Sequence, residues 1–323
     1  MQTIYYSINR RIANCKFPIG YEHEYIKLLD GGQTSLCWPT INGSRVNLED
    51  KAPLVILLAG LTGGTHDVYI YKSMNECIKA GLGCVLLNHR GCSKIKITTP
   101  QIYCAGFTSD LSEATIYLNA NYPNHTLYAA GFSLGANILI NYLGEMGSKS
   151  LIRGAISVSN PFDLMEVENG MAKSYMGNMY RKMLGNHQIK KAKEHIEVLG
   201  PYYKNKYGKD LSEELNKVKR NYDFDTLLTS KMFPYKTAYS YYRQSSCLLK
   251  LNEIAVPCLL VHSEDDPIAC YIPYDEVNGN GNIIMAVVKC GGHVAFYDGL
   301  IPNQWLGTPI REFVKAVESL HTK

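Results

Sequence analysis

The sequence predicts an α/β fold in which a mostly parallel central sheet is flanked by helices and carries a helical cap insertion. Short apolar runs alternate with segments of helical spacing along most of the chain, which is typical of a parallel sheet covered on both faces. A glycine-flanked serine stands between one apolar run and the helix that follows it. The alternation stops between residues 161 and 246, where the composition changes. At 323 residues the chain has room for one such domain with an insertion.

The predicted strands and helices follow one another in the order that this fold requires. Residues 23–38 alternate around Asp30-Gly31-Gly32, which indicates a hairpin. After the hairpin we expect strands at residues 54–59, 84–87, 127–130, 155–158, 258–262 and 283–288. Where apolar residues recur at helical spacing, we expect helices at residues 68–80, 111–122, 136–143 and 310–320.

The break in this alternation predicts a cap. Residues 161–246 are rich in Lys, Glu, Tyr and Met and show no clear buried strand. Because this segment follows the strand after the serine helix, it would lie over the carboxyl ends of the strands. We therefore predict a core formed by residues 1–160 and 247–323, with a helical cap or lid at residues 161–246.

Composition and charge exclude several classes of function. The net charge is +4 and the lysines are scattered, with no basic stripe among aromatic residues, so we expect no nucleic-acid partner. The ten cysteines form no C-x-x-C pair and no zinc-ligand spacing, which predicts free thiols in a reducing, cytoplasmic compartment. No run of about 18 apolar residues and no signal peptide is found. Without H-E-x-x-H, P-loop or complete G-x-G-x-x-G motifs, we expect no metal and no nucleotide cofactor.

A nucleophile is predicted at Ser133, in the stretch Gly131-Phe132-Ser133-Leu134-Gly135. A serine squeezed between a strand and a helix requires a very tight turn, and glycines two residues away on either side leave room for it. This turn lifts the hydroxyl above the sheet. It also leaves the Leu134 N–H, at the helix N-terminus, available to hold an oxyanion.

A base and an acid follow the serine in the expected order. His293 comes after Cys290-Gly291-Gly292 and the last predicted strand, so its imidazole would stand on a flexible turn; the alternative is an ordinary surface histidine. Asp266 lies in the segment HSEDDP, at the end of another strand, with Asp265 as its neighbouring competitor. A turn or N-cap role is compatible with the catalytic one. A serine hydroxyl needs a base to take its proton, and that base needs an orienting carboxylate.

The second oxyanion donor is expected in the loop after the first buried strand. Residues 60–64 (GLTGG) occupy that place, and the Leu61 N–H is the candidate. The alternative is an ordinary glycine-rich turn.

Many separate motifs, in order, resemble one α/β-hydrolase family. This family includes the mammalian α/β-hydrolase domain proteins one, two and three, the yeast medium-chain ethyl ester synthases, and related plant and bacterial esterases. The matching stretches are Gln2-Thr3-Ile4, residues 58–64 with Tyr69-Ile70, Asn88-His89-Arg90-Gly91, Thr99-Pro100, Tyr103, Gly106, Thr108, Asp110-Leu111, residues 131–137, Tyr142-Leu143-Gly144, residues 160–163, Asp223-Phe224-Asp225 with Thr229, and Tyr241-Tyr242. The chain departs from the family pattern at Ala59, where many relatives have His or Pro. The detailed shape of the oxyanion loop is therefore the feature that the resemblance predicts least well.

The resemblance implies an α/β-hydrolase fold with Ser133 as nucleophile, Asp266 as acid and His293 as base. It also implies acyl-ester substrates, which are simple esters, acylglycerols or phospholipids in different members. We therefore expect a serine-dependent carboxylic ester hydrolase that works through an acyl-enzyme. Its expected substrates are small-molecule or lipid esters. Peripheral contact with a membrane surface is compatible with this expectation. The alternatives are an acyltransferase or ester synthase with the same triad, and an inactive hydrolase fold used for binding.

Methionines of the predicted cap are candidates for substrate binding. Met171, Met176, Met179 and Met183 recur at near-helical spacing. Unbranched methionine adapts to flexible chains, so Met179 and Met183 are expected to line an acyl-chain pocket. The alternative is a helix face that packs on the body of the protein.

Overall fold

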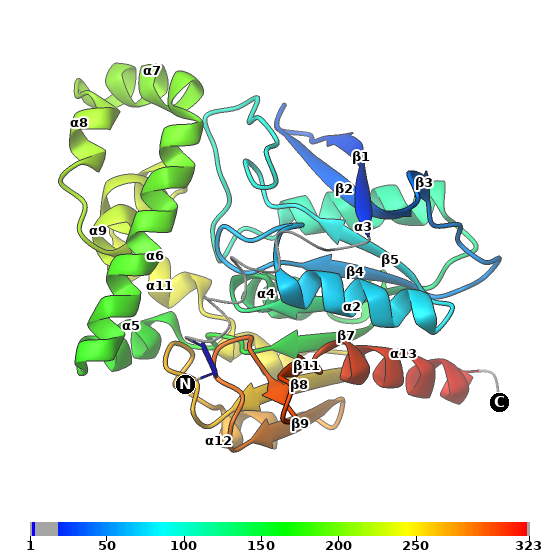
Figure 1. Cartoon of the computed structure of the whole chain (residues 1–323). Coiled ribbons are helices and arrows are strands. Elements are labelled where there is room, and N and C mark those ends of the chain that lie inside the picture. Colours follow the sequence, from blue (N-terminus) through cyan, green and yellow to red (C-terminus); the bar gives the residue numbers. More distant parts are fainter. Residues whose placement is uncertain (1, 4–18, 322–323) are drawn as a thin grey trace.

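Over residues 2–3 and 19–321, which the computed structural model describes, a sheet of nine strands forms the centre of the protein (Figure 1). Its strands lie in the order β1-β2-β5-β4-β6-β7-β8-β9, with β3 paired to β2. The six strands from β5 to β9 in this order are parallel to one another, whereas β1, β2 and β3 form an antiparallel edge. The mostly parallel sheet predicted from the sequence is therefore confirmed. Its strands are β1 (Gly20–Lys27), β2 (Gln33–Ile41), β3 (Ser44–Arg45), β4 (Leu54–Leu58), β5 (Gly83–Leu87), β6 (Leu127–Phe132), β7 (Ile152–Val158), β8 (Cys258–Ser263) and β9 (Ile283–Val288).

Helices cover both faces of this sheet (Figure 1). The helices are α2 (Val68–Lys79) and α13 (Gly307–His321) on one face, and α3 (Ser109–Asn121) and α4 (Leu134–Met146) on the other. Alternate side chains of a strand point to opposite faces of the sheet. Because helices cover both faces, every residue of β4 is buried. Leu54, Ile56 and Leu58 pack with α3 and α4, whereas Val55 and Leu57 pack with α2 and α13. An uninterrupted apolar run is what such a two-sided position requires.

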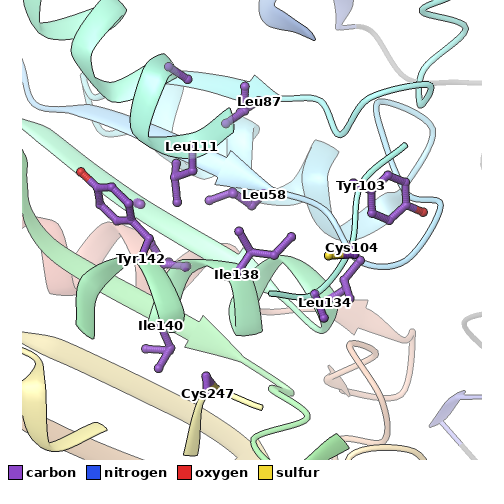
Figure 2. Packing of buried hydrophobic residues seen from close by; sticks show 14 of the residues in the cluster. Leu58, Leu87, Tyr103, Cys104, Leu111, Leu134, Ile138, Ile140, Tyr142 and Cys247 are labelled. Atoms are coloured by element: carbon purple, nitrogen blue, oxygen red, sulfur yellow. The ribbon is translucent and has the colours of Figure 1, made fainter. Parts of the chain in front are cut away.

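The packing under α3 and α4 is seen at close range in Figure 2. Leu58 of β4 meets Leu111 of α3 and Ile138 of α4 in one continuous apolar cluster. Because α4 starts directly after Ser133, its burial against the sheet fixes the position of that turn.

The register of the parallel strands brings their carboxyl ends to one level. Leu58, the last residue of β4, pairs with Leu87 of β5 on one side and with Gly131 of β6 on the other. The loop after β4 therefore begins beside the turn that contains Ser133.

A buried arginine ties the hairpin to the body of the protein. Arg90, just after β5, is 1% exposed and donates two hydrogen bonds to Asp110 of α3, at 2.8 and 2.6 Å. It donates a third, at 2.7 Å, to Asp30 in the turn between β1 and β2. A buried guanidinium requires such paired carboxylates. This contact gives a structural role to Arg90 of the Asn88-His89-Arg90-Gly91 stretch and to the later Asp110.

Between β7 and β8 the chain forms helices and turns and adds no strand to the sheet, and every residue of this stretch is described. Figure 1 shows these helices as a layer beside the sheet at the end where β7 points. Asp163 and Ser174 accept hydrogen bonds from the first turns of α5 and α6, so each helix begins at an N-cap residue. The helices are α5 (Leu164–Ala172), α6 (Tyr175–Glu194), α7 (Ile196–Tyr207), α8 (Leu211–Leu215), α9 (Asn221–Phe224), η2 (Asp225–Thr229), α10 (Ser230–Met232) and α11 (Ala238–Ser245). That this layer acts as a cap stays a prediction.

Shorter elements complete the described chain. They are η1 (Gly147–Lys149), η3 (Leu248–Glu253), α12 (Tyr274–Val277), and a separate pair of strands, β10 (Tyr297–Asp298) and β11 (Asn303–Gln304). Gln2 and Thr3 are described, whereas Ile4 of the same predicted motif lies outside the described residues.

Candidate active site

Ser133 occupies a strained turn between β6 and α4. Its φ is 52° and its ψ is −117°, a conformation that costs a residue with a side chain on the order of 1–3 kcal/mol. A Cβ atom on Gly131 would lie 2.6 Å from the Gly135 carbonyl oxygen, and one on Gly135 would lie 2.4 Å from the Leu58 carbonyl oxygen. No side chain fits at either position, so the two glycines of the motif are what allows the turn to close.

Three strand ends bring Ser133, His293 and Asp266 together. The Ser133 Oγ lies 2.8 Å from His293 Nε2. On the other side of the imidazole, Nδ1 lies 2.9 Å from Asp266 Oδ2 and 3.1 Å from its Oδ1. The serine follows β6, the aspartate β8 and the histidine β9, as the order of motifs in the sequence predicts.

The carboxylate of Asp266 is fully buried and accepts several hydrogen bonds. Its side chain is 0% exposed, and its Oδ1 accepts from the Ile268 and Ala269 N–H groups at 2.9 Å each. Burial by itself raises the pKa of Asp266, but His293 and these hydrogen bonds outweigh it and bring the pKa below its ordinary value. An anionic Asp266 accepts a hydrogen bond from the Nδ1–H group, which leaves Nε2 unprotonated as the acceptor for the serine hydroxyl.

Asp265 does not reach the imidazole. Its Oδ1 accepts hydrogen bonds from the backbone N–H groups of Gly291 and Gly292, at 2.8 and 2.7 Å. The two adjacent carboxylates therefore contact different parts of the same loop, and the ring of His293 contacts Asp266.

The loop after β4 lies directly against Ser133. A Cβ atom on Gly60 would be 3.3 Å from the Cβ of Ser133. The Gly60 N–H donates to the Tyr69 hydroxyl at 2.9 Å, and the Thr62 N–H donates to the Tyr103 hydroxyl at 2.6 Å. Between these two anchored amides, the Leu61 N–H has no hydrogen-bond partner within the described part of the chain.

Two tyrosines and a histidine support this loop, a role that the sequence motifs did not predict for any of them. The rings of His89 and Tyr103 stack with centroids 4.7 Å apart. His89 Nε2 lies 2.8 Å from the Ala59 carbonyl oxygen. Burial lowers the pKa of His89, so its ring is neutral and can donate this hydrogen bond. Tyr69 and Tyr103 stood within matching motifs, but the backbone groups that their hydroxyls contact depend on tertiary structure.

Two cavities meet at Ser133 and His293. The larger has a volume of about 490 Å³ and is lined on one side by Met183, His187 and Lys190 of α6. The smaller, of about 100 Å³, is mainly apolar. Its apolar lining includes Leu61, Leu134, Leu164, Val167, Met171, Leu184 and Ile268.

The structure separates the two methionines that were predicted to bind substrate. Met183 is half-buried and lines the larger cavity. Met179 is 44% exposed and lines neither of these cavities. Its neighbours Tyr180 and Arg181 occupy the buried face of α6, which turns Met179 toward solvent. Met171, on α5, lines the smaller cavity instead.

A buried carboxyl group stands in the wall of the smaller cavity. Asp225 accepts hydrogen bonds from the Tyr242 hydroxyl at 2.7 Å, the Thr229 hydroxyl at 2.7 Å and the Gln188 amide at 3.2 Å. Asp225, Thr229 and Tyr242 belong to one of the sequence motifs, so the structure gives this motif a physical basis. Burial raises the pKa of Asp225 to about 6 in spite of these donors.

This pKa predicts a pH-dependent stability difference. Between pH 4 and 6 the folded protein keeps a proton on Asp225 that the unfolded chain releases, so the free energy of unfolding falls as the pH rises. Asp225→Asn removes this titration. From pH 4 to pH 7, the free energy of unfolding of the variant should therefore rise by about 2 kcal/mol relative to that of the wild type. Urea unfolding at both pH values measures the difference, and a difference that does not change with pH would contradict it.

Within residues 2–3 and 19–321, His, Cys, Asp and Glu side chains form no group of three or more that could hold a metal ion. Among the described helices, none combines the length and apolar character needed to cross a bilayer.

Comparison with known proteins finds a matching family model and relatives that align with most of this chain. A family model described as the alpha/beta hydrolase fold matches residues 53–300. The monoacylglycerol lipase of Saccharomyces cerevisiae is 35% identical over 275 residues, which are 84% of this chain and 61% of that protein. Phospholipase ABHD3 of Mus musculus is 30% identical over 320 residues, which are 95% of this chain and 74% of that protein. The chain thus spans less than two thirds of the length of the yeast relative.

Solved structures agree on the fold. The esterase Pf2001 of Pyrococcus furiosus aligns with a TM-score of 0.56 at 19% sequence identity, over 92% of this chain and 93% of that chain. At this identity the likeness concerns the arrangement of strands and helices.

Proposed function

Since this chain belongs to the α/β-hydrolase family, we propose that it is a serine-dependent carboxylic ester hydrolase that works through an acyl-enzyme. The observation that carries the proposal is the unbroken line of hydrogen bonds from Ser133 Oγ through the imidazole of His293 to the buried Asp266. The names of the relatives, a lipase and a phospholipase, support acyl esters as the substrate class.

The proposed reaction begins with attack on the ester carbonyl. Ser133 Oγ bonds to the carbonyl carbon while its proton passes to His293 Nε2, and the carbonyl oxygen becomes an oxyanion. The N–H groups of Leu61 and Leu134, two residues that line the smaller cavity together with Ser133, would hold this oxyanion. The C–O bond to the alcohol then breaks, and the alcohol leaves with the proton from His293.

A second half-reaction releases the acid. Water gives a proton to His293 Nε2 and attacks the acyl-enzyme, and the returning proton restores the Ser133 hydroxyl. Throughout both steps the anionic Asp266 stabilises the imidazolium that forms beside it.

The two cavities suit the two halves of an ester. The smaller, apolar cavity favours the acyl chain, because burying each CH₂ contributes about 0.8 kcal/mol. The larger cavity carries polar side chains, such as His187 and Lys190, and favours the alcohol or head group. We therefore propose small-molecule or lipid acyl esters as substrates.

A labelling experiment tests the proposal. A fluorophosphonate probe should react with the purified protein, and mass spectrometry should place the adduct on Ser133. Turnover of an acyl ester in the presence of ethanol then separates the two uses of the acyl-enzyme. Free acid as the main product supports hydrolysis, whereas a dominant ethyl ester would identify an ester synthase. An unlabelled and inactive protein would indicate a binding role.

The apolar cavity predicts a change in chain-length preference. Leu164→Trp places a larger side chain in the cavity wall and should move the optimum to shorter acyl chains, with esters of the shortest acids still turned over. The matched control is Leu249→Trp, because Leu249 is 83% exposed and lies outside both cavities. Relative kcat/KM over a series of esters of graded length measures the effect. An identical profile for both variants would remove the acyl chain from this cavity.

A further inference from the structure

The loop that carries His293 is held through its backbone by side chains from three other parts of the chain. Four consecutive N–H groups, from residue 291 to residue 294, each donate to a side-chain oxygen. The pairs are Gly291 N to Asp265 Oδ1 at 2.8 Å, Gly292 N to Asp265 Oδ1 at 2.7 Å, His293 N to Thr3 Oγ1 at 2.9 Å, and Val294 N to Ser159 Oγ at 3.2 Å. We call Thr3, Ser159 and Asp265 the loop anchors.

The conformation of this loop shows why it needs such anchors. Gly292, Val294 and Phe296 all have positive φ values, of 58°, 50° and 45°. Two of these residues carry side chains, for which this region costs about 1–3 kcal/mol each. Within the loop itself, one backbone hydrogen bond is found, from the Phe296 N–H to the Gly291 oxygen at 2.8 Å. Contacts from outside the loop must therefore hold the strained backbone in place.

Thr3 reaches this loop from the opposite end of the chain, 290 residues away in sequence. Its side chain is buried and lines the larger cavity beside His293. A Cβ atom on Gly292 would lie 2.5 Å from Thr3 Oγ1 and 2.9 Å from Thr3 N, so the two segments are in close contact.

Gln2 extends the same contact along the loop. Its Oε1 accepts from the Tyr297 N–H at 2.8 Å, and its Nε2 donates to the Tyr297 oxygen at 3.2 Å. Residues 2–3 thus bind both His293 and the strand that follows it.

The other two anchors come from strand ends. Asp265 follows β8, and Ser159 follows β7 and is completely buried. Burial raises the pKa of Asp265, but the hydroxyl of Ser263 and the two glycine N–H groups more than compensate, so the pKa is lowered overall. An anionic oxygen is a strong acceptor for two backbone donors.

We propose that Thr3, Asp265 and Ser159 are positioning residues that fix His293 through its backbone and so keep Nε2 within hydrogen-bond distance of Ser133 Oγ. The inference rests on the proposed function, because it assigns these residues to the base of that reaction. All three anchors accept hydrogen bonds from backbone N–H groups of the loop, so their effect on the imidazole passes through the position of the loop. The Gln2-Thr3-Ile4 motif thereby gains a role in catalysis.

Thr3 allows the sharpest test, because valine has the same shape as threonine and no hydroxyl. In Thr3→Val, kcat and the rate constant for fluorophosphonate labelling of Ser133 should both fall about 10-fold, since small displacements of a catalytic group cost one to two orders of magnitude. The KM for the ester should stay near that of the wild type. Thr3→Ser keeps the acceptor oxygen and should restore most of the lost rate.

Thr115→Val is the matched control. Thr115 is also buried and its hydroxyl is hydrogen-bonded, but it lies in α3 inside the core. This variant loses a buried hydroxyl and should keep the kcat of the wild type. If Thr115→Val slowed labelling as much as Thr3→Val, the effect would come from general destabilisation and the proposal would be wrong.

Asp265 provides a second, independent pair of variants if Thr3→Val does not fold. Asp265→Ala removes the acceptor and should lower kcat about 10-fold or more, whereas Asp265→Asn keeps an oxygen and should lower it less. Wild-type rates in both Thr3→Val and Asp265→Ala would overturn the proposal. Failure of the proposed function is a different result, in which the wild type itself is neither labelled at Ser133 nor active on esters.

Discussion

Ser133→Ala is expected to reduce ester hydrolysis by about 10⁴-fold or more, to near the background rate. The variant keeps the cavities, the imidazole and the N–H groups of Leu61 and Leu134, but no oxygen remains 2.8 Å from His293 Nε2. Alanine has a Cβ like serine, so it bears the same strain at a φ of 52° and the fold should be retained. The measurement is kcat/KM on an acyl ester, together with thermal unfolding.

Ser150→Ala serves as the control for this variant. Ser150 is also half-buried and hydrogen-bonded, but it precedes β7 at the end of the sheet remote from the site. It should keep full activity and fluorophosphonate labelling. An adduct found on any residue other than Ser133, or a Ser133→Ala variant that still turns over esters, would refute the assignment of the nucleophile.

The second large effect is expected for Asp266→Asn, which should lower kcat by about 10⁴-fold. The Asn oxygen can still accept from the Ile268 and Ala269 N–H groups, so its NH₂ group would face the imidazole. The ring would then carry its proton on Nε2, where it cannot accept the proton of Ser133. The pKa of Asp266 is below its ordinary value, so the wild type should not lose this carboxylate anywhere near neutral pH.

Asp265→Asn is the internal comparison. Its oxygen contacts backbone N–H groups of the same loop, and an amide oxygen can replace a carboxylate oxygen there at some loss of strength. The ratio of kcat for the two variants is therefore informative. Should Asp265→Asn be the slower enzyme, the acid of the proposed triad would have to be reassigned.

Much of the fold and the outline of the site could be predicted because they depend on short-range rules. An unbroken apolar run such as residues 54–58 specifies a strand buried on both faces. Gly131 and Gly135 specify the tight turn because no side chain fits there. The serine, the aspartate and the histidine each follow a predicted strand, now seen as β6, β8 and β9, so their order could also be predicted.

The rest depends on contacts between residues far apart in the chain. Whether Met179 or Met183 faces the substrate depends on the rotation of α6 against its neighbours, which a near-helical spacing leaves undetermined. The hydroxyl of Tyr103 supports Thr62 across 41 residues, and Thr3 supports His293 across 290. A motif marked these residues, but only their positions in space assign each to a particular backbone group.

The distance in sequence between Thr3 and His293 also has a consequence for folding during synthesis on the ribosome. Ser133, the proposed nucleophile, is synthesised 160 residues before His293, the proposed base, and Thr3 is synthesised 290 residues before that histidine. Domains fold as they leave the ribosome, where synthesis proceeds at about 5–20 residues per second. On the ribosome, a nascent chain that ends before residue 293 contains β6, the serine turn and α4, but it lacks the proposed base. We therefore expect a fluorophosphonate probe to distinguish chains that contain His293 from shorter nascent chains, because reactivity at Ser133 should arise only after the loop that carries His293 has docked beside it.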